Sequence, residues 1–278
     1  MTQRIDSLVQ VTDAYEVIVL DQWGVLHDGH TLYPQTKTCL QRLRDAGCRL
    51  AVLSNSGKRA ADNADRITEM GIPHDTFEVV MTSGEALWRD IVAKTIFEKR
   101  FYPIERTPGD AAAWGLGLDI ELTRDMKGAD AILLMGLPDG SHLQQWQKTL
   151  QRALAQRLKI YCSNPDLASP RPDGLVISPG ALAHDYQKKG GEVIFYGKPH
   201  RPLFDSLQTA LGAQRIVMVG DSLDHDIQGA QNAGWDSVLV QGGLYAQTFA
   251  ADAPDQALAA LLAERTCAPP TYRIEILQ

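Results

Sequence analysis

Short apolar runs alternate with amphipathic segments along the first part of the chain. Val17–Leu20, Arg49–Leu53 and Glu78–Met81 are short and mostly apolar, which is typical of buried β-strands. Between them, residues 34–46 and 60–70 place apolar or small side chains at helical spacing, and each segment is followed by a glycine. This alternation predicts a parallel sheet whose strands are joined by crossover helices.

The same pattern returns near the end of the chain. Residues 193–196, 216–219 and 237–240 are apolar runs that predict three more strands. Residues 202–211 and 227–233 have helical periodicity, and the second of these ends at a glycine. We therefore expect the two ends of the chain to form one α/β domain.

The middle of the chain carries elements of its own. Residues 131–135 and 158–161 predict strands, and residues 142–156 predict a long polar helix. The intervening segment is long enough to be an independent domain. The sequence thus predicts an α/β core interrupted by an inserted second α/β domain, with the core at 1–83 and 191–278 and the insertion at 84–190.

Composition excludes several classes of function. The 278 residues carry a net charge of −7, which disfavours a nucleic-acid partner because the phosphates would repel an acidic surface. Apolar runs of the ~18–20 residues that a membrane span needs are missing, and Met1–Asp6 lacks the apolar core of a secretion signal. The four cysteines lie far apart, so we expect reduced thiols in a cytoplasmic protein without a membrane partner.

Polar side chains with complementary chemistry follow four of the predicted strands. Asp21 is a carboxylate before a glycine turn, and Ser54–Gly57 offers hydroxyls and amides ahead of a helix. Gly197–His200 holds a lysine in a rigid turn, and Gly220–Asp226 is a carboxylate cluster suited to a hard cation such as Mg2+. The carboxyl ends of parallel strands meet at one crevice, so these groups predict a phosphoryl-transfer site.

In this order the four segments resemble the motifs of the haloacid dehalogenase superfamily. They read Asp-x-x-Gly-Val, Leu-Ser-Asn, Gly-Lys-Pro and Gly-Asp-x-x-x-x-Asp. The insertion resembles the α/β cap, type C2, of class IIA, which includes NagD-like, p-nitrophenyl phosphate and pyridoxal phosphate phosphatases. Residues 163–166 and 179–182 are similar to that cap as well. The resemblance implies a Rossmann-like core and a cap that determines substrate specificity.

The resemblance also implies a nucleophile and a metal site. Asp21 corresponds to the carboxylate that attacks phosphorus. Asp221 corresponds to a direct Mg2+ ligand, and Asp226 to a residue that supports the metal. The backbone carbonyl two residues after the nucleophile, here that of Trp23, is a further ligand in the family. We therefore expect Mg2+ to be held by Asp21, Trp23, Asp221 and Asp226.

The expected substrate is a small phosphorylated metabolite. Sugar phosphates, pyridoxal phosphate and short organic phosphates all remain open, and the resemblance makes a homodimer formed through the cap plausible. Asn164 and Asp166 follow a predicted strand and are equally typical of a specificity loop and of a simple Asn-Pro-Asp turn. Lys198 is expected to bridge the phosphate and the nucleophile. The expected substrate-binding residues are Ser54, Asn55, Ser56, Asn164, Asp166 and Lys198, of which Ser54 and Lys198 act with Asp21 in catalysis.

Trp23 stands where phosphatases of this superfamily have a second aspartate, the general acid/base. An indole does not exchange a proton at neutral pH, and losing a general acid/base typically costs about 10²–10⁴-fold in rate. A phosphohydrolase could draw its acid from elsewhere, with His27, Asp28 and His184 as candidate donors, or it could take substrates with good leaving groups. Two alternatives to a phosphatase stay open. One is a catalytically silent phospho-ligand binder in which Trp23 stacks on the ligand, and the other is a dehalogenase-like hydrolase.

Overall fold

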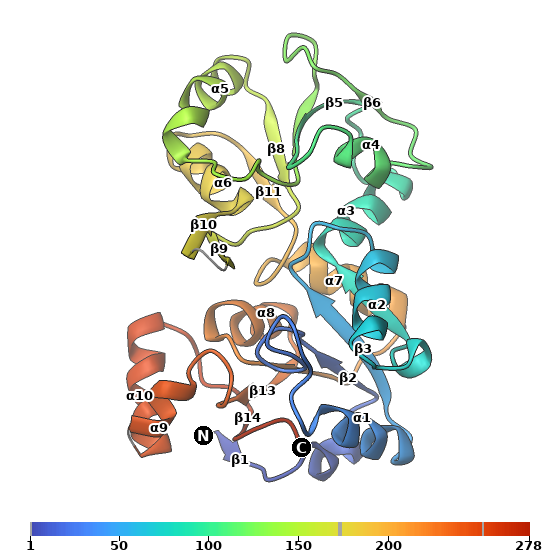
Figure 1. Cartoon of the computed structure of the whole chain (residues 1–278), viewed down its shortest axis with the longest axis vertical. Helices are drawn as coiled ribbons and strands as arrows, with labels where there is room; N and C mark the ends of the chain where they lie inside the picture. Colours follow the sequence, from blue (N-terminus) through green and yellow to red (C-terminus); the bar gives the residue numbers. More distant parts are fainter. Residues whose placement is uncertain (1, 172–173, 252) are drawn as a thin grey trace. The chain divides into compact units, whose positions relative to one another are not determined.

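The computed structural model describes residues 2–171, 174–251 and 253–278, and these form two compact units (Figure 1). Unit 1 comprises Met1–Ser54, Ala61–Met81 and Lys198–Gln278, and unit 2 comprises Asn55–Ala60 and Thr82–Gly197. The chain leaves unit 1 after Ser54 and after Met81, and it returns at Ala61 and at Lys198. Within the described residues, no helix is both long and apolar enough to cross a membrane.

Unit 1 is built on a seven-stranded sheet, counted over the described residues. In the order given next, the strands from Gln3–Arg4 to Arg49–Ser54 are all parallel to their neighbours. In spatial order the strands are β1 (Gln3–Arg4), β14 (Tyr272–Ile274), β13 (Asp236–Val240), β12 (Ile216–Gly220), β2 (Val17–Leu20), β3 (Arg49–Ser54) and β4 (Val79–Thr82). In the register, Leu20 pairs with both Val219 and Val52. The residues that follow β2, β12 and β3 are therefore neighbours at one edge of the sheet.

Helices cover both faces of this sheet. Val238 and Val240 of β13 pack in one apolar cluster, whereas Leu239 between them packs in another with Leu258 and Leu261. Such alternation places helices on either side of a parallel sheet, as in a Rossmann-like fold, and confirms the predicted fold class. The helices are α1 (Thr36–Asp45), α2 (Ala60–Glu69), α7 (Arg201–Leu211), α8 (Gln228–Ala233), α9 (Ala246–Ala251) and α10 (Pro254–Arg265), with short helical turns at Leu8–Ala14, His74–Thr76 and Leu223–Ile227.

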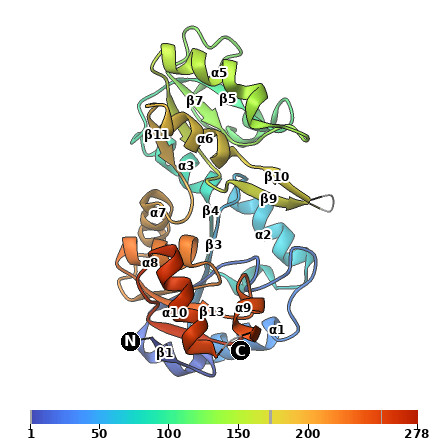
Figure 2. The ribbon, with the colours of Figure 1, turned by 90° about the vertical axis from the view of Figure 1, so that its left-hand side faces the viewer.

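Unit 2 has a parallel sheet of its own and an antiparallel hairpin. The sheet order is β11 (Val193–Phe195), β8 (Lys159–Cys162), β7 (Ala131–Leu134), β5 (Arg100–Ile104) and β6 (Glu121–Leu122), and the hairpin is β9 (Ala168–Arg171) with β10 (Gly174–Ile177). The helices are α3 (Ser83–Val92), α4 (Asp110–Trp114), α5 (Leu143–Ala155) and α6 (Pro179–Lys188). Leu150 of α5 and Leu182 of α6 share one apolar cluster with β7 and β8. Figure 2 shows the hairpin extending away from the sheet.

Strand β11 lies in a different sheet from the one that its sequence pattern suggested. Val193 pairs with Ile160 and Phe195 with Cys162, so the strand completes the sheet of unit 2. The chain enters unit 1 only at Lys198, rather than at residue 191. An apolar run of this kind fits any buried parallel strand, and its composition does not specify which sheet receives it.

Glu85 on α3 ties the segment 55–60 to unit 2. Its carboxylate, with a side chain only 8% exposed, accepts from Arg59 Nε at 2.7 Å and from Arg89 Nε at 3.1 Å. Burial alone would raise the pKa of Glu85, but the hydrogen bond from Arg59 and the other donors hold it below its usual value. Arg59 also stacks over the ring of Trp88, with its guanidinium carbon 3.8 Å from the centroid. The segment that follows Ser54 is therefore held by a buried ionic contact.

We expect Glu85→Gln to destabilise the protein by about 1–3 kcal/mol, because two cations lose a buried charged acceptor. Urea unfolding followed by tryptophan fluorescence measures this change. Arg89→Gln is the matched control, since its pair with Glu85 is an i,i+4 contact at a half-exposed site and should matter by only about 0.3–0.5 kcal/mol. Equal unfolding midpoints for Glu85→Gln and the wild type would contradict this account.

Candidate functional site

A buried lysine joins two carboxylates at the strand ends of unit 1. Asp21 follows β2, and Lys198 Nζ lies 2.7 Å from Asp21 Oδ1 and 2.7 Å from Asp226 Oδ1. Lys198 is 3% exposed and Asp226 is fully buried. Burial alone would lower the pKa of Lys198, but the two carboxylates raise it above its usual value. The ammonium group is therefore a permanent charge that holds both carboxylates in place.

Asp226 is placed by close backbone packing. A Cβ added to Gly220, the last residue of β12, would lie 2.2 Å from Asp226 Cβ. The Ser222 N–H donates to Asp226 Oδ2 at 3.0 Å, across the helical turn that begins at Leu223. Asp224 in the same segment pairs instead with Arg265 at 3.0 Å. Asp221 and Asp226 therefore belong to the buried carboxylate cluster with Asp21, whereas Asp224 does not.

Asp221 sits in a cradle made by glycines, which the sequence analysis did not identify. A Cβ added to Gly24 would lie 1.7 Å from Asp221 Oδ2, and one added to Gly243 would lie 2.4 Å from it. The Leu244 N–H donates to the same oxygen at 2.8 Å. The signal in the sequence was the pair Gly242-Gly243 just after β13, because a glycine pair at a strand end permits close backbone approach.

The three carboxylates of this cluster fit a divalent cation. Asp21, Asp221 and Asp226 each offer an oxygen, and these oxygens lie within 4.8 Å of one another. Burial, followed by the charge of Asp226, raises the pKa of Asp21, although Lys198 opposes the shift. Burial, followed by the charges of Asp21 and Asp226, raises the pKa of Asp221. The single ammonium group of Lys198 does not balance three carboxylates, so the cluster favours a hard cation that prefers oxygen ligands.

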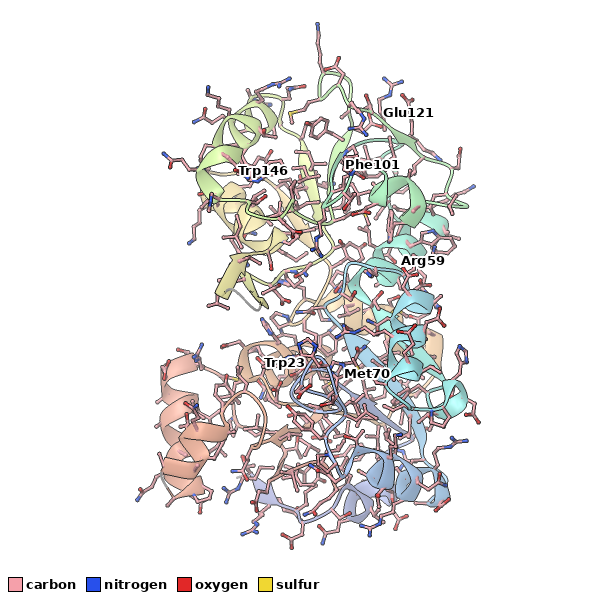
Figure 3. All side chains as sticks on the ribbon, viewed as in Figure 1. Trp23, Arg59, Met70, Phe101, Glu121 and Trp146 are labelled. Atoms are coloured by element: carbon pink, nitrogen blue, oxygen red, sulfur yellow. The ribbon has the colours of Figure 1, made fainter. Side chains whose placement is uncertain are left out.

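Trp23 lies on the loop after β2, in the core unit (Figure 3). Its side chain is 46% exposed, whereas the preceding Gln22 is buried and donates its amide to Asn63 Oδ1. The indole edge lies against Gly29, where an added Cβ would be 3.3 Å from Trp23 Nε1. Gly29 has a φ of +103°, which favours glycine, and its lack of a side chain leaves room for the indole.

The three candidate proton donors named from the sequence have other contacts. His27 is 2% exposed, and its Nδ1 accepts from the Gly29 N–H at 3.0 Å. Burial, reinforced by Arg66, lowers the pKa of His27 to about 4, so the imidazole is neutral. Asp28 accepts two N–H groups of its own turn, which lower its pKa. His184 stacks on the Phe195 ring with centroids 4.6 Å apart.

The remaining predicted site residues divide between the two units. Ser54 ends β3 in unit 1, and Asn55 and Ser56 begin the first segment of unit 2. Asn55 Nδ2 donates to Asp166 Oδ1 at 2.8 Å, and the Asp166 N–H donates to Asn164 Oδ1 at 2.9 Å. The second contact is the turn that the Asn-Pro-Asp pattern suggested. The first is a long-range contact that no local pattern contains.

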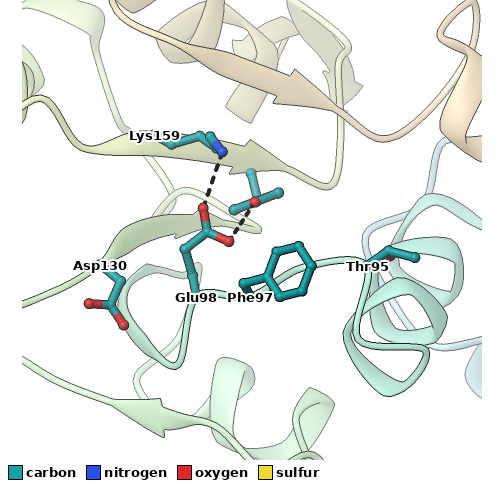
Figure 4. A pocket seen from close by; sticks show the side chains of 6 residues that line it. Thr95, Phe97, Glu98, Asp130 and Lys159 are labelled. Carbon is teal, nitrogen blue, oxygen red and sulfur yellow. Dashed lines mark hydrogen bonds and ion pairs between the residues drawn. The ribbon is translucent and has the colours of Figure 1, made fainter.

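A shallow surface pocket of about 590 Å³ lies elsewhere in unit 2 (Figure 4). Its lining includes Glu98, which accepts a hydrogen bond from the Tyr161 hydroxyl at 2.9 Å and pairs with Lys159 at 3.2 Å. Phe97 beside it is 82% exposed. Glu98 thus pairs with two other lining residues, and the lining of this pocket contains none of the predicted site residues.

Comparisons with known proteins agree with the motif order. A family model described as haloacid dehalogenase-like hydrolase matches residues 18–118, which include Asp21 and Ser54. A second, HAD-hydrolase-like model matches residues 195–264, which include Lys198, Asp221 and Asp226. Dihydroxyacetone phosphatase of Corynebacterium glutamicum is 25% identical over 239 residues, covering 81% of this chain and 80% of that protein. The 5'-nucleotidase YutF of Bacillus subtilis is 27% identical over 237 residues, covering 83% and 88%.

Solved structures show the same architecture over nearly the whole chain. A haloacid dehalogenase-like hydrolase of Brucella suis 1330 matches with a TM-score of 0.79 and 27% identity, covering 99% of this chain and all of that one. A 4-nitrophenylphosphatase of Thermotoga maritima matches with a TM-score of 0.74 and 23% identity, covering 96% of each chain. The molecule is an enzyme of the phosphatase-type hydrolases. It belongs to the haloacid dehalogenase-like hydrolases, and its fold is that of their class IIA branch.

Proposed function

We propose that this chain is a Mg2+-dependent phosphohydrolase that acts on a small phosphorylated metabolite through an aspartyl-phosphate on Asp21. The observation that carries the proposal is the buried contact of Lys198 Nζ with both Asp21 and Asp226, 2.7 Å from each, beside Asp221. A carboxylate held by a cation at a sheet edge is aligned for nucleophilic attack.

Each catalytic side chain has a distinct task in this proposal. Asp21 attacks the phosphorus atom, and Lys198 holds Asp21 while it neutralises a phosphoryl oxygen. Ser54 ends the neighbouring strand β3 and donates its hydroxyl to the phosphoryl group. Lys198 is held by its two carboxylates before the substrate arrives, so this donor needs little reorganisation during the reaction.

Mg2+ would be held by Asp21, Asp221, Asp226 and the backbone carbonyl of Trp23. The carboxylate oxygens within 4.8 Å of one another, with only one ammonium among them, support this site. When bound, Mg2+ supplies positive charge that neutralises the transferred phosphoryl group. A backbone carbonyl is independent of the side chain, so the tryptophan at position 23 is compatible with this ligand set.

We further propose that the inserted domain, expected at 84–190, selects the substrate, with Asn164 and Asp166 as its contact residues beside Asn55 and Ser56 of the segment after Ser54. The hydrogen bond from Asn55 to Asp166 supports this role because it pins the polar turn of the insertion to the segment after Ser54. The named activities of two relatives, on dihydroxyacetone phosphate and 5'-nucleotides, support a small phosphorylated substrate.

We expect wild-type protein to release p-nitrophenol from p-nitrophenyl phosphate only with Mg2+, and Asp21→Asn to lower the rate by at least about 10³-fold. The leaving group of this substrate barely needs an acid, so Trp23 does not mask the activity. Asp224→Asn is the matched control, because that carboxylate pairs with Arg265 outside the cluster. Wild-type release at the rate of Asp21→Asn, with both proteins folded, would sink the phosphatase proposal and favour phospho-ligand binding.

The metal site has a readout that does not depend on activity. Carboxyls whose pKa is raised by folding bind protons more tightly in the folded state, so stability falls as pH rises through the raised pKa. We expect the melting temperature of the metal-free protein to decrease as the pH rises from about 5 to about 8. Mg2+ should raise the melting temperature, and this increase should be larger at the higher pH.

Differential scanning fluorimetry with EDTA or Mg2+ measures this effect. Asp221→Asn should show a weaker pH dependence and lose the response to Mg2+, whereas Asp224→Asn should keep both. An equal Mg2+ response in Asp221→Asn and the wild type would contradict the proposed ligand set.

A further inference from the structure

The loop after Asp21 presents a half-exposed aromatic ring two residues beyond that carboxylate. Trp23 is two residues from Asp21, and its indole is 46% exposed although most of the surrounding loop is buried. One edge of the ring lies against Gly29, where an added Cβ would be 3.3 Å from Nε1. A half-exposed indole offers a planar face for stacking.

Three other polar side chains of this loop have contacts of their own. Gln22 donates to Asn63, and His27 is buried with Nδ1 accepting from the Gly29 N–H. Asp28 accepts the N–H groups of His30 and Thr31. His30 is the exposed titratable side chain of residues 22–31, all of which the structure describes, for which the structure shows no side-chain hydrogen bond. The indole at position 23 itself offers a stacking face and no proton, so His30 is the residue of this loop that a test for a replacement acid must include.

We propose that the substrate is a phosphoryl compound whose leaving group is planar, conjugated and stable as an anion, namely an aryl, enol or acyl phosphate, and that Trp23 determines this specificity. The proposal rests on the phosphohydrolase function proposed above. The alcohol of an alkyl phosphate leaves as a strongly basic alkoxide unless an acid protonates it, and the indole of Trp23 cannot supply that proton. A conjugated oxyanion needs none, and its plane matches the indole.

The two chemical steps balance without a protein acid or base at position 23. Asp21 Oδ forms a bond to phosphorus, the bond from phosphorus to the leaving oxygen breaks, and that oxygen departs with the electron pair as an anion. A water oxygen then bonds to phosphorus, the bond to Asp21 breaks, and the proton of the water goes to solvent. With no base to activate water, the second step is slow, so different good substrates should share one kcat preceded by a burst.

The test compares p-nitrophenyl phosphate, acetyl phosphate and glycerol 3-phosphate with the Mg2+-loaded enzyme. We expect kcat/KM for the first two to exceed that for glycerol 3-phosphate by at least about 10²-fold. Trp23→Asp should narrow this ratio by raising the rate on glycerol 3-phosphate. The Trp23→Leu variant lacks both an acid and an aromatic ring. It should keep the ratio of kcat/KM between acetyl phosphate and glycerol 3-phosphate, but its KM for p-nitrophenyl phosphate should rise about 2- to 10-fold.

Two results would overturn the proposal while leaving the phosphohydrolase intact. One is wild-type hydrolysis of glycerol 3-phosphate as efficient as that of p-nitrophenyl phosphate. The other is a selective loss of alkyl phosphate hydrolysis in His30→Gln, which would identify that imidazole as the acid. Failure of the underlying function looks different, because no substrate would then release phosphate in an Asp21-dependent way.

Discussion

The site depends on one buried cation. Lys198 Nζ contacts Asp21 and Asp226 at 2.7 Å each, from a side chain that is almost fully buried. Removing one partner from such a contact leaves an uncompensated buried charge, which typically costs about 3–5 kcal/mol. The same contact that stabilises this edge of the sheet also aims the carboxylate that we propose as nucleophile. Structure and chemistry at this edge therefore depend on the same side chain.

Close backbone approach supplies the rest of the geometry. Gly24 and Gly243 leave room for Asp221, and Gly220 leaves room for Asp226, so several glycines shape the cluster as firmly as its carboxylates do. The loop after β2 has a different character, because Gln22 and His27 are buried whereas the indole of Trp23 is half exposed. In the function that we propose, a metal-binding carboxylate cluster is thus combined with an aromatic side chain two residues after the nucleophile.

Much of this arrangement was accessible from the sequence, and the exceptions have physical reasons. The parallel α/β fold followed from the alternation of buried runs and amphipathic helices, and the order of four strand-end motifs indicated the family. The sequence pattern did not predict which sheet β11 joins, because its apolar run fits either sheet. The contact of Asn55 with Asp166 and the pairing of Asp224 with Arg265 depend on tertiary structure. No spacing rule contains such contacts.

Covalent phosphorylation of Asp21 is the central claim, and mass spectrometry of acid-quenched enzyme tests it most directly. Protein mixed with Mg2+ and p-nitrophenyl phosphate, quenched during turnover and digested, should contain one phosphoryl group on the peptide that carries Asp21. The slow second step should make this species a large fraction of the enzyme. Turnover without any protein-bound phosphoryl group, or with the group on another residue, would contradict the account.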